Sequence, residues 1–173
     1  MDIKTLRAQC ARRLAGLEIP DPFDIDVLCE NVATHRGRPL HVLPLPDGAP
    51  SGMPCGMWMG TGNADFVWYD GSTSRAHAGH IIAHELAHIL CDHFGPVDEV
   101  LSASLAPQID PSTVKLMLGR TRYDTEQERE AELMASLLTA PAAAIPKVEG
   151  TVLSRLHDNL FAPTRGRRIG GGR

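Results

Sequence analysis

The chain has 173 residues, of which 43% are hydrophobic and 22% charged, and its formal net charge is −4. This predicts one soluble globular domain, and the small negative charge gives no bulk attraction to nucleic acid or an anionic membrane. No apolar run approaches the roughly 20 residues of a transmembrane helix, and the N-terminus lacks the apolar stretch of a signal peptide. We therefore expect a cytoplasmic protein whose four cysteines are buried thiols.

The first 70 residues predict two helices followed by short strands. Apolar residues recur at spacings of three and four over residues 3–17, and a second helix is expected from Asp24 as N-cap to Gly37. Residues 39–45 predict a strand limited by prolines. The apolar runs 55–59 and 65–69, separated by a glycine-containing turn, predict a hairpin whose aromatic residues belong to the core.

The second half of the chain predicts further helices. One is expected from about Arg75 to Phe94, ending at a Gly-Pro pair, and a strong one over residues 125–139. Residues 97–123 are harder to assign, although 111–118 fit a short helix with proline at its first position. A last helix is expected over residues 150–161. The chain then predicts a mostly helical α+β domain with about three strands over residues 1–163, followed by a flexible Arg/Gly-rich tail over 164–173.

The motif His-Glu-x-x-His lies inside the helix expected from Arg75. His84 and His88 are one turn apart and Glu85 follows the first of them, which is the arrangement that holds Zn²⁺ and positions a base. At about 100° per residue, both histidines fall opposite the apolar side of the helix. A solvated polar face is the simpler alternative, but two histidines and a glutamate in this register favour a metal site.

Two histidines leave Zn²⁺ under-coordinated, so we expect a third ligand on the helix over residues 125–139. The buried arc of that helix is defined by Ala131, Met134, Leu137 and Leu138. Glu130 falls inside this arc, where burial of an unpaired carboxylate is costly and a bound Zn²⁺ would compensate its charge. Glu126 is the main alternative, and Glu128 lies at the edge of the arc. A salt bridge from the buried glutamate to an arginine of residues 120–122 is the explanation without a metal.

The predicted site therefore binds one Zn²⁺ per chain through His84, His88 and Glu130, with Glu85 as general base for a zinc-activated water. A second group that stabilises the oxyanion is usual in such sites. The candidates for it are His77, His80, His93 and Tyr123. This chemistry is that of a zinc endopeptidase. A zinc-containing module that regulates a partner by contact alone is the alternative.

The two motifs together resemble the ImmA/IrrE family of metallopeptidases. HELAH at residues 84–88 is followed by EREAELMASLLTAP at residues 128–141. The second segment is similar to the family pattern E-x-E-A-N-x-F-A-x-x-L-L-x-P. Glu132 stands where asparagine is common and Met134 where phenylalanine is common, and neither change removes a predicted ligand.

This resemblance implies a compact zincin-like fold with a small sheet, and it implies Glu130 as the third ligand. It also implies that the substrate is a helix-turn-helix transcriptional repressor, whose cleavage releases genes controlled by stress or mobile elements. Direct contact with nucleic acid or a membrane is not expected.

Overall fold

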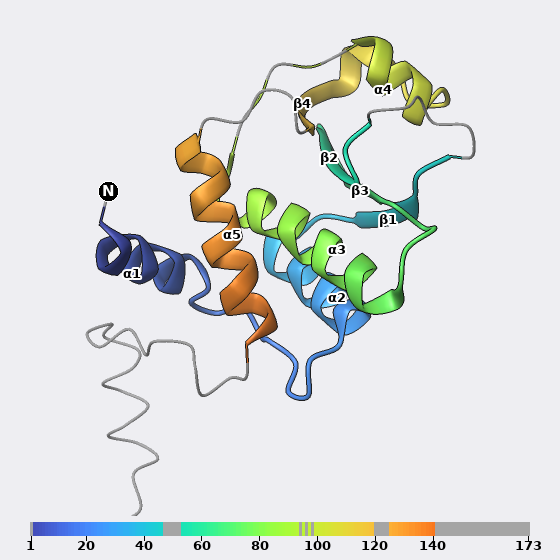
Figure 1. The fold of residues 1–173 in the computed structure, drawn as a ribbon. Helices are drawn as coiled ribbons and strands as arrows, with labels where there is room; N and C mark the ends of the chain where they lie inside the picture. The colour runs from blue at the N-terminus through green and yellow to red at the C-terminus, as the bar shows by residue number, and fades with distance from the viewer. Residues whose placement is uncertain are drawn as a thin grey trace, which may run out of the picture.

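The computed structural model describes residues 2–46, 53–93, 95, 97, 99–119 and 125–140 of the chain. Within these ranges the chain forms helices and one small sheet (Figure 1). In chain order the elements are α1 (Ile3–Arg13), α2 (Ile25–Arg36), β1 (Leu40–Pro44), β2 (Gly56–Thr61), β3 (Asp65–Tyr69), α3 (Arg75–Leu90), α4 (Glu99–Leu105), the 3₁₀ turn η1 (Pro111–Thr113), β4 (Val114–Gly119) and α5 (Thr125–Thr139).

The sheet has the strand order β1-β3-β2-β4 and is mixed. β1 runs parallel to β3, whereas β2 is antiparallel to both β3 and β4. The predicted hairpin is present, with Trp58 of β2 opposite Val67 of β3. On its other side Trp58 is paired with Leu118 of β4. β2 is therefore an inner strand, and all six of its residues are buried.

The sheet separates two apolar clusters because successive side chains of a strand point to opposite faces. Trp58 and Val67 belong to the larger cluster, which also contains Leu86 of α3. Met57 and Trp68 belong to the smaller one, together with Leu105 of α4. Figure 1 shows α3 along one side of the strands and α4 on the other.

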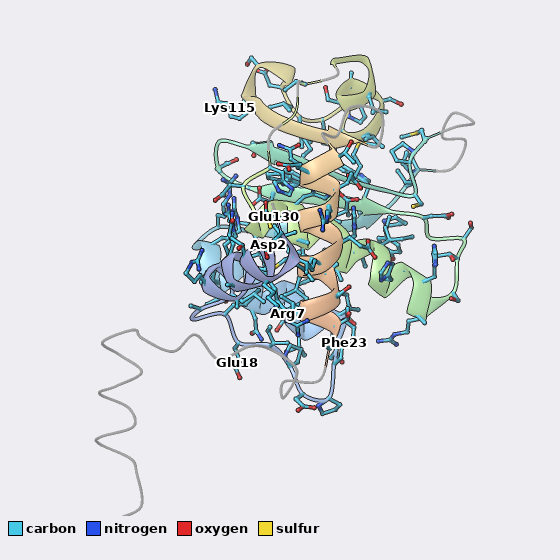
Figure 2. The ribbon with its side chains drawn as sticks, turned by 60° about the vertical axis from the view of Figure 1, so that its left-hand side comes forward. Asp2, Arg7, Glu18, Phe23, Lys115 and Glu130 are labelled. Atoms are coloured by element: carbon cyan, nitrogen blue, oxygen red, sulfur yellow. The ribbon has the colours of Figure 1, made fainter. Side chains whose placement is uncertain are left out.

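Helix α3 lies at the centre of the larger cluster. It packs against β2 and β3 on one side and against α5 on the other, and α1 covers α5 in turn. Figure 2 shows α5 upright in front of α3, with α1 beside it. Leu86 and Ile89 of α3 are completely buried, and each such side chain stabilises the fold by about 1.5–3 kcal/mol relative to an exposed one.

The predicted α+β class is confirmed, but in the described part of the chain the sheet has four strands rather than about three. The helix predicted over residues 111–118 is wrong. That segment forms η1 and then β4, because Val114, Leu116 and Leu118 alternate with other residues and the free edge of β2 is available for pairing. Helix α3 also ends earlier than predicted, at Leu90.

Two predictions concern residues outside the described part of the chain. The expected helix over residues 150–161 and the tail over residues 164–173 are both outside them. Of the helices in the described ranges, none has the length and apolar character that crossing a bilayer requires.

A buried carboxylate joins α2 to the sheet. Asp65, at the start of β3, is 1% exposed and accepts a hydrogen bond from Nε1 of Trp58 at 3.1 Å. Its Oδ2 lies 3.0 Å from Nε of Arg36 and 3.2 Å from Nε of Arg38. Arg36 also donates to the carbonyl of Ile89 at the C-terminal end of α3. Asp65 therefore holds together the end of α2, the hairpin and the helix that carries the motif.

We predict that Asp65→Ala lowers the free energy of unfolding by about 3 kcal/mol, because it removes the buried carboxylate that compensates the charge of two partly buried guanidinium groups. Urea denaturation measures the change. The control is Asp26→Ala, which removes an exposed ion pair with Arg75 and should change stability little. Equal losses in the two variants would contradict the assigned role of Asp65.

Candidate metal centre

Helix α3 presents the two histidines of the motif on the side that faces α5. The helix begins after Ser74, whose Oγ accepts a hydrogen bond from the backbone N–H of His77. The Nε2 atoms of His84 and His88 lie 3.0 Å apart. His84 is partly exposed, whereas His88 is completely buried.

Glu128 of α5 completes this group. One of its carboxylate oxygens lies 3.6 Å from Nε2 of His84, and the other lies 3.5 Å from Nε2 of His88. We call His84, His88 and Glu128 the metal triad. A tetrahedral centre with bonds of about 2.0–2.1 Å needs ligand atoms roughly 3.3–3.4 Å apart. The separations in the triad are close to that value, so the three side chains can hold a metal ion.

The charge state of His88 supports a metal in this position. Burial, together with the neighbouring His84 and His93, lowers the pKa of His88 to about 3. His88 is therefore neutral at neutral pH, and its contact with Glu128 is not an ion pair. Two imidazoles and one carboxylate face a common point, and these are nitrogen and oxygen donors that suit a divalent metal ion.

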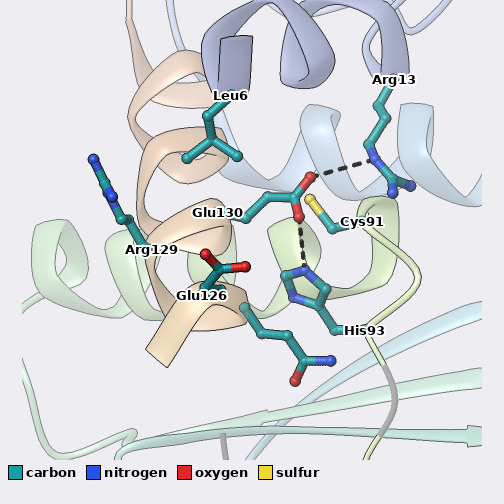
Figure 3. Close-up of a pocket in the computed structure, with 8 residues that line it drawn as sticks. Leu6, Arg13, Cys91, His93, Glu126, Arg129 and Glu130 are labelled. Atoms are coloured by element: carbon teal, nitrogen blue, oxygen red, sulfur yellow. Dashed lines mark hydrogen bonds and ion pairs between the residues drawn. The ribbon is translucent and has the colours of Figure 1, made fainter. Parts of the chain in front are cut away.

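The structure places Glu130, the predicted third ligand, away from the triad. Its Oε1 lies 3.5 Å from Nε of Arg13 in α1, and its Oε2 lies 3.4 Å from Nε2 of His93 (Figure 3). Glu126, the predicted alternative, lines the same cavity as Glu130. Glu130 thus forms a salt bridge with an arginine, as the explanation without a metal proposed. The arginine is Arg13 rather than one of residues 120–122.

Helix geometry explains why Glu130 lies away from the two histidines of the motif. Glu128 and Glu130 are two residues apart, which separates them by about 200° around α5. They therefore flank the buried arc from opposite sides, and α3 meets the side of Glu128 while α1 meets the side of Glu130. Glu132, four residues after Glu128, returns to the first side, and its carboxylate lies 3.5 Å from Nδ1 of His84. In the sequence, the four-residue spacing of Glu128 and Glu132 indicates that these two glutamates lie on the same side of α5.

Glu85 lies beside the triad, on a cavity of about 440 Å³. Its side chain is buried at 4% exposure and lies directly against β2. A Cβ atom at Gly56 would be only 2.6 Å from Oε1 of Glu85 and 2.6 Å from Cγ2 of Ile81. The missing side chain at position 56 is therefore what leaves room for the Glu85 carboxylate.

The four candidates for oxyanion stabilisation fall in different places. His77 and His80 line the 440 Å³ cavity and are exposed, so they lie where the cavity meets solvent. His93 is buried at 4% exposure, with its Nδ1 atom 2.9 Å from Nδ1 of His88. Tyr123 lies outside the described residues. His77 and His80 are thus the two candidates that the structure places at the cavity.

Comparison with protein-family models, curated proteins and solved structures finds no match for this chain. The chemistry of the site is therefore inferred from the geometry of the metal triad and of Glu85.

We predict that Gly56→Ala lowers the free energy of unfolding by about 1–3 kcal/mol, because the added methyl group overpacks the contact between β2 and Glu85. Chemical denaturation measures the loss. Gly62→Ala is the matched control, since a Cβ atom there meets nothing within 4 Å and should leave stability nearly unchanged. A Gly56→Ala protein as stable as the control would show that Glu85 does not need this space.

Proposed function

We propose that the protein is a zinc-dependent endopeptidase. The observation that carries this proposal is the convergence of His84, His88 and Glu128 beside the buried carboxylate of Glu85. A glutamate that directly follows the first histidine of such a pair is placed to exchange protons with a water at the metal.

The residues of the triad would hold Zn²⁺ with two nitrogen donors and one carboxylate, a ligand set that leaves one position open in catalytic zinc sites. When bound there, zinc supplies Lewis acidity, which polarises a carbonyl group and lowers the pKa of a water. The exposed edge of His84 faces the 440 Å³ cavity, so the triad is reached from the same side as Glu85.

Glu85 would accept a proton from the attacking water and return it to the leaving amine. Its position supports this role, because β2 holds the carboxylate in place on one side and the cavity lies on the other. His77 or His80 would donate a hydrogen bond to the oxygen on which negative charge develops. Both lie on the α3 surface that lines the cavity.

The proposed substrate is a helix-turn-helix transcriptional repressor. This part of the proposal is supported by the resemblance of residues 84–88 and 128–141 to the ImmA/IrrE motifs. With Glu128 in the triad, the opening glutamate of the second motif would be the third ligand in place of Glu130.

We predict about one zinc per chain in the purified protein, and its loss in His84→Ala, measured by elemental analysis. Glu85→Gln should retain zinc, because Glu85 is not a ligand, and should cleave a helix-turn-helix repressor that the wild type cleaves at least about 100-fold more slowly. Mass spectrometry of the repressor after incubation measures the cleavage.

Cleavage by Glu85→Gln at the wild-type rate would contradict the role of the base. A zinc-loaded wild-type protein that forms a stable complex with intact repressor would contradict proteolysis and favour the non-proteolytic binding module. The matched control is Glu18→Gln, the same chemical change at a residue that precedes α2 and lies outside the residues lining the cavity.

A further inference from the structure

Behind the metal triad lies a second group of chemically reactive side chains. The donor atoms of Cys91, His93 and Glu130 lie within 4.8 Å of one another. They line a cavity of about 250 Å³ between α1 and α5, in which Figure 3 shows Glu130 between Arg13 and His93. The two groups are joined through the contact between Nδ1 of His88 and Nδ1 of His93, at 2.9 Å.

The end of α3 brings His93 to this position. Asp92 adopts a left-handed backbone conformation with φ of 53°. The N–H of Asp92 donates to the carbonyl of Ile89, and the N–H of His93 donates to the carbonyl of His88. These two bonds form a Schellman motif. This motif reverses the direction of the chain, so that the ring of His93 lies against the ring of His88.

The hydrogen bonds through this contact have one consistent direction. A neutral imidazole carries one N–H and one lone pair. If Nε2 of His88 offers its lone pair to the triad, its N–H is on Nδ1 and donates to Nδ1 of His93. The N–H of His93 is then on Nε2, and it points to Oε2 of Glu130 at 3.4 Å.

Residues of α1 contact Glu130, the last residue in this series of hydrogen bonds from His88 through His93. Oε1 of Glu130 lies 3.3 Å from Nε2 of Gln9, which donates to it, and 3.5 Å from Nε of Arg13. Arg13 also donates to the carbonyl of Leu90 at the end of α3. The negative charge of Glu130 is thus compensated by a guanidinium group that is itself held against the helix carrying the triad.

A second metal at Cys91, His93 and Glu130 would conflict with a metal at the triad. Binding through Nε2 of His93 would place its N–H on Nδ1. That N–H would face the N–H of His88 across 2.9 Å, and two donors cannot share this contact. Arg13 already supplies Glu130 with a positive charge, which favours the triad as the site of the metal.

We propose that His93 and Glu130 are positioning residues that hold His88 with its Nε2 lone pair directed at the metal triad. This inference rests on the proposed function, since it requires a metal there. Groups that fix the tautomer of a ligating histidine are commonly worth 10–100-fold in metal affinity. For His84 the corresponding contact is Glu132, whose side chain is 61% exposed and should contribute less.

We predict that His93→Phe weakens zinc binding by about 10–100-fold, measured by competition with a chromophoric chelator. His93→Gln should recover affinity to within a few-fold, because its carbonyl oxygen can accept from His88 and its amide can donate to Glu130. Thermal unfolding of both metal-free variants controls for loss of fold. Cys91→Ser is the matched control and should bind zinc like the wild type.

The tautomer itself can be read in the zinc-loaded wild-type protein. Long-range ¹H–¹⁵N spectra of the histidine rings should show His93 with its proton on Nε2 and His88 with its proton on Nδ1. This readout depends on neither catalysis nor any variant, so it tests the inference even if His93→Phe does not fold.

Several results would overturn the inference alone: zinc affinity unchanged in His93→Phe, a proton on Nδ1 of His93, or a second zinc that Cys91→Ser removes. That last result would identify a second metal site at Cys91, His93 and Glu130. Failure of the wild-type chain to bind zinc at all would instead contradict the proposed function, and this inference with it.

Discussion

The packing of α5 across α3 is the contact on which the site depends. Small side chains lie in the cluster shared by the two helices, where Ala87 of α3 and Ala131 and Ala135 of α5 are all completely buried. Small residues let two helix backbones approach closely. That approach is what allows the short carboxylate arm of Glu128 to reach the ring nitrogens of His84 and His88.

The same packing gives α5 two chemically different flanks. One flank directs Glu128 to the metal triad, and the other directs Glu130 to Arg13 and His93. His88 lies between the two, with Nε2 on the side of Glu128 and Nδ1 beside His93. A metal ion and a guanidinium group would therefore compensate the two carboxylates from opposite sides. The arrangement makes α1 part of the support of the site, although α1 contributes no residue to the triad.

Several of the elements that form the site could be predicted from local sequence patterns. The helix bearing His84, Glu85 and His88, the β2–β3 hairpin and the helix over residues 125–139 all follow from periodicity and end signals, and the structure contains each of them. Periodicity also predicted the buried arc of α5. It could not predict which neighbouring helix meets each edge of that arc, so it selected Glu130, whose partners are 37 and 117 residues away along the chain at His93 and Arg13.

The position of His93 and the fourth strand were missed for related reasons. His93 reaches His88 through the left-handed turn at Asp92, and asparagine or glycine is the more familiar sign of such a turn than aspartate. β4 forms only because β2, more than 50 residues earlier in the chain, offers it a free edge. Tertiary partners rather than local propensity decided both features.

The central claim, that the triad of His84, His88 and Glu128 holds the metal, is tested most directly by one matched pair of variants. Zinc dissociation constants are measured for Glu128→Gln and Glu130→Gln, the same chemical change two residues apart on α5. We predict at least about a 100-fold loss of affinity for Glu128→Gln, which removes a ligand, and at most about a 10-fold loss for Glu130→Gln, whose amide oxygen can still accept from His93. A larger loss of affinity for Glu130→Gln than for Glu128→Gln would show that Glu128 is not the third ligand.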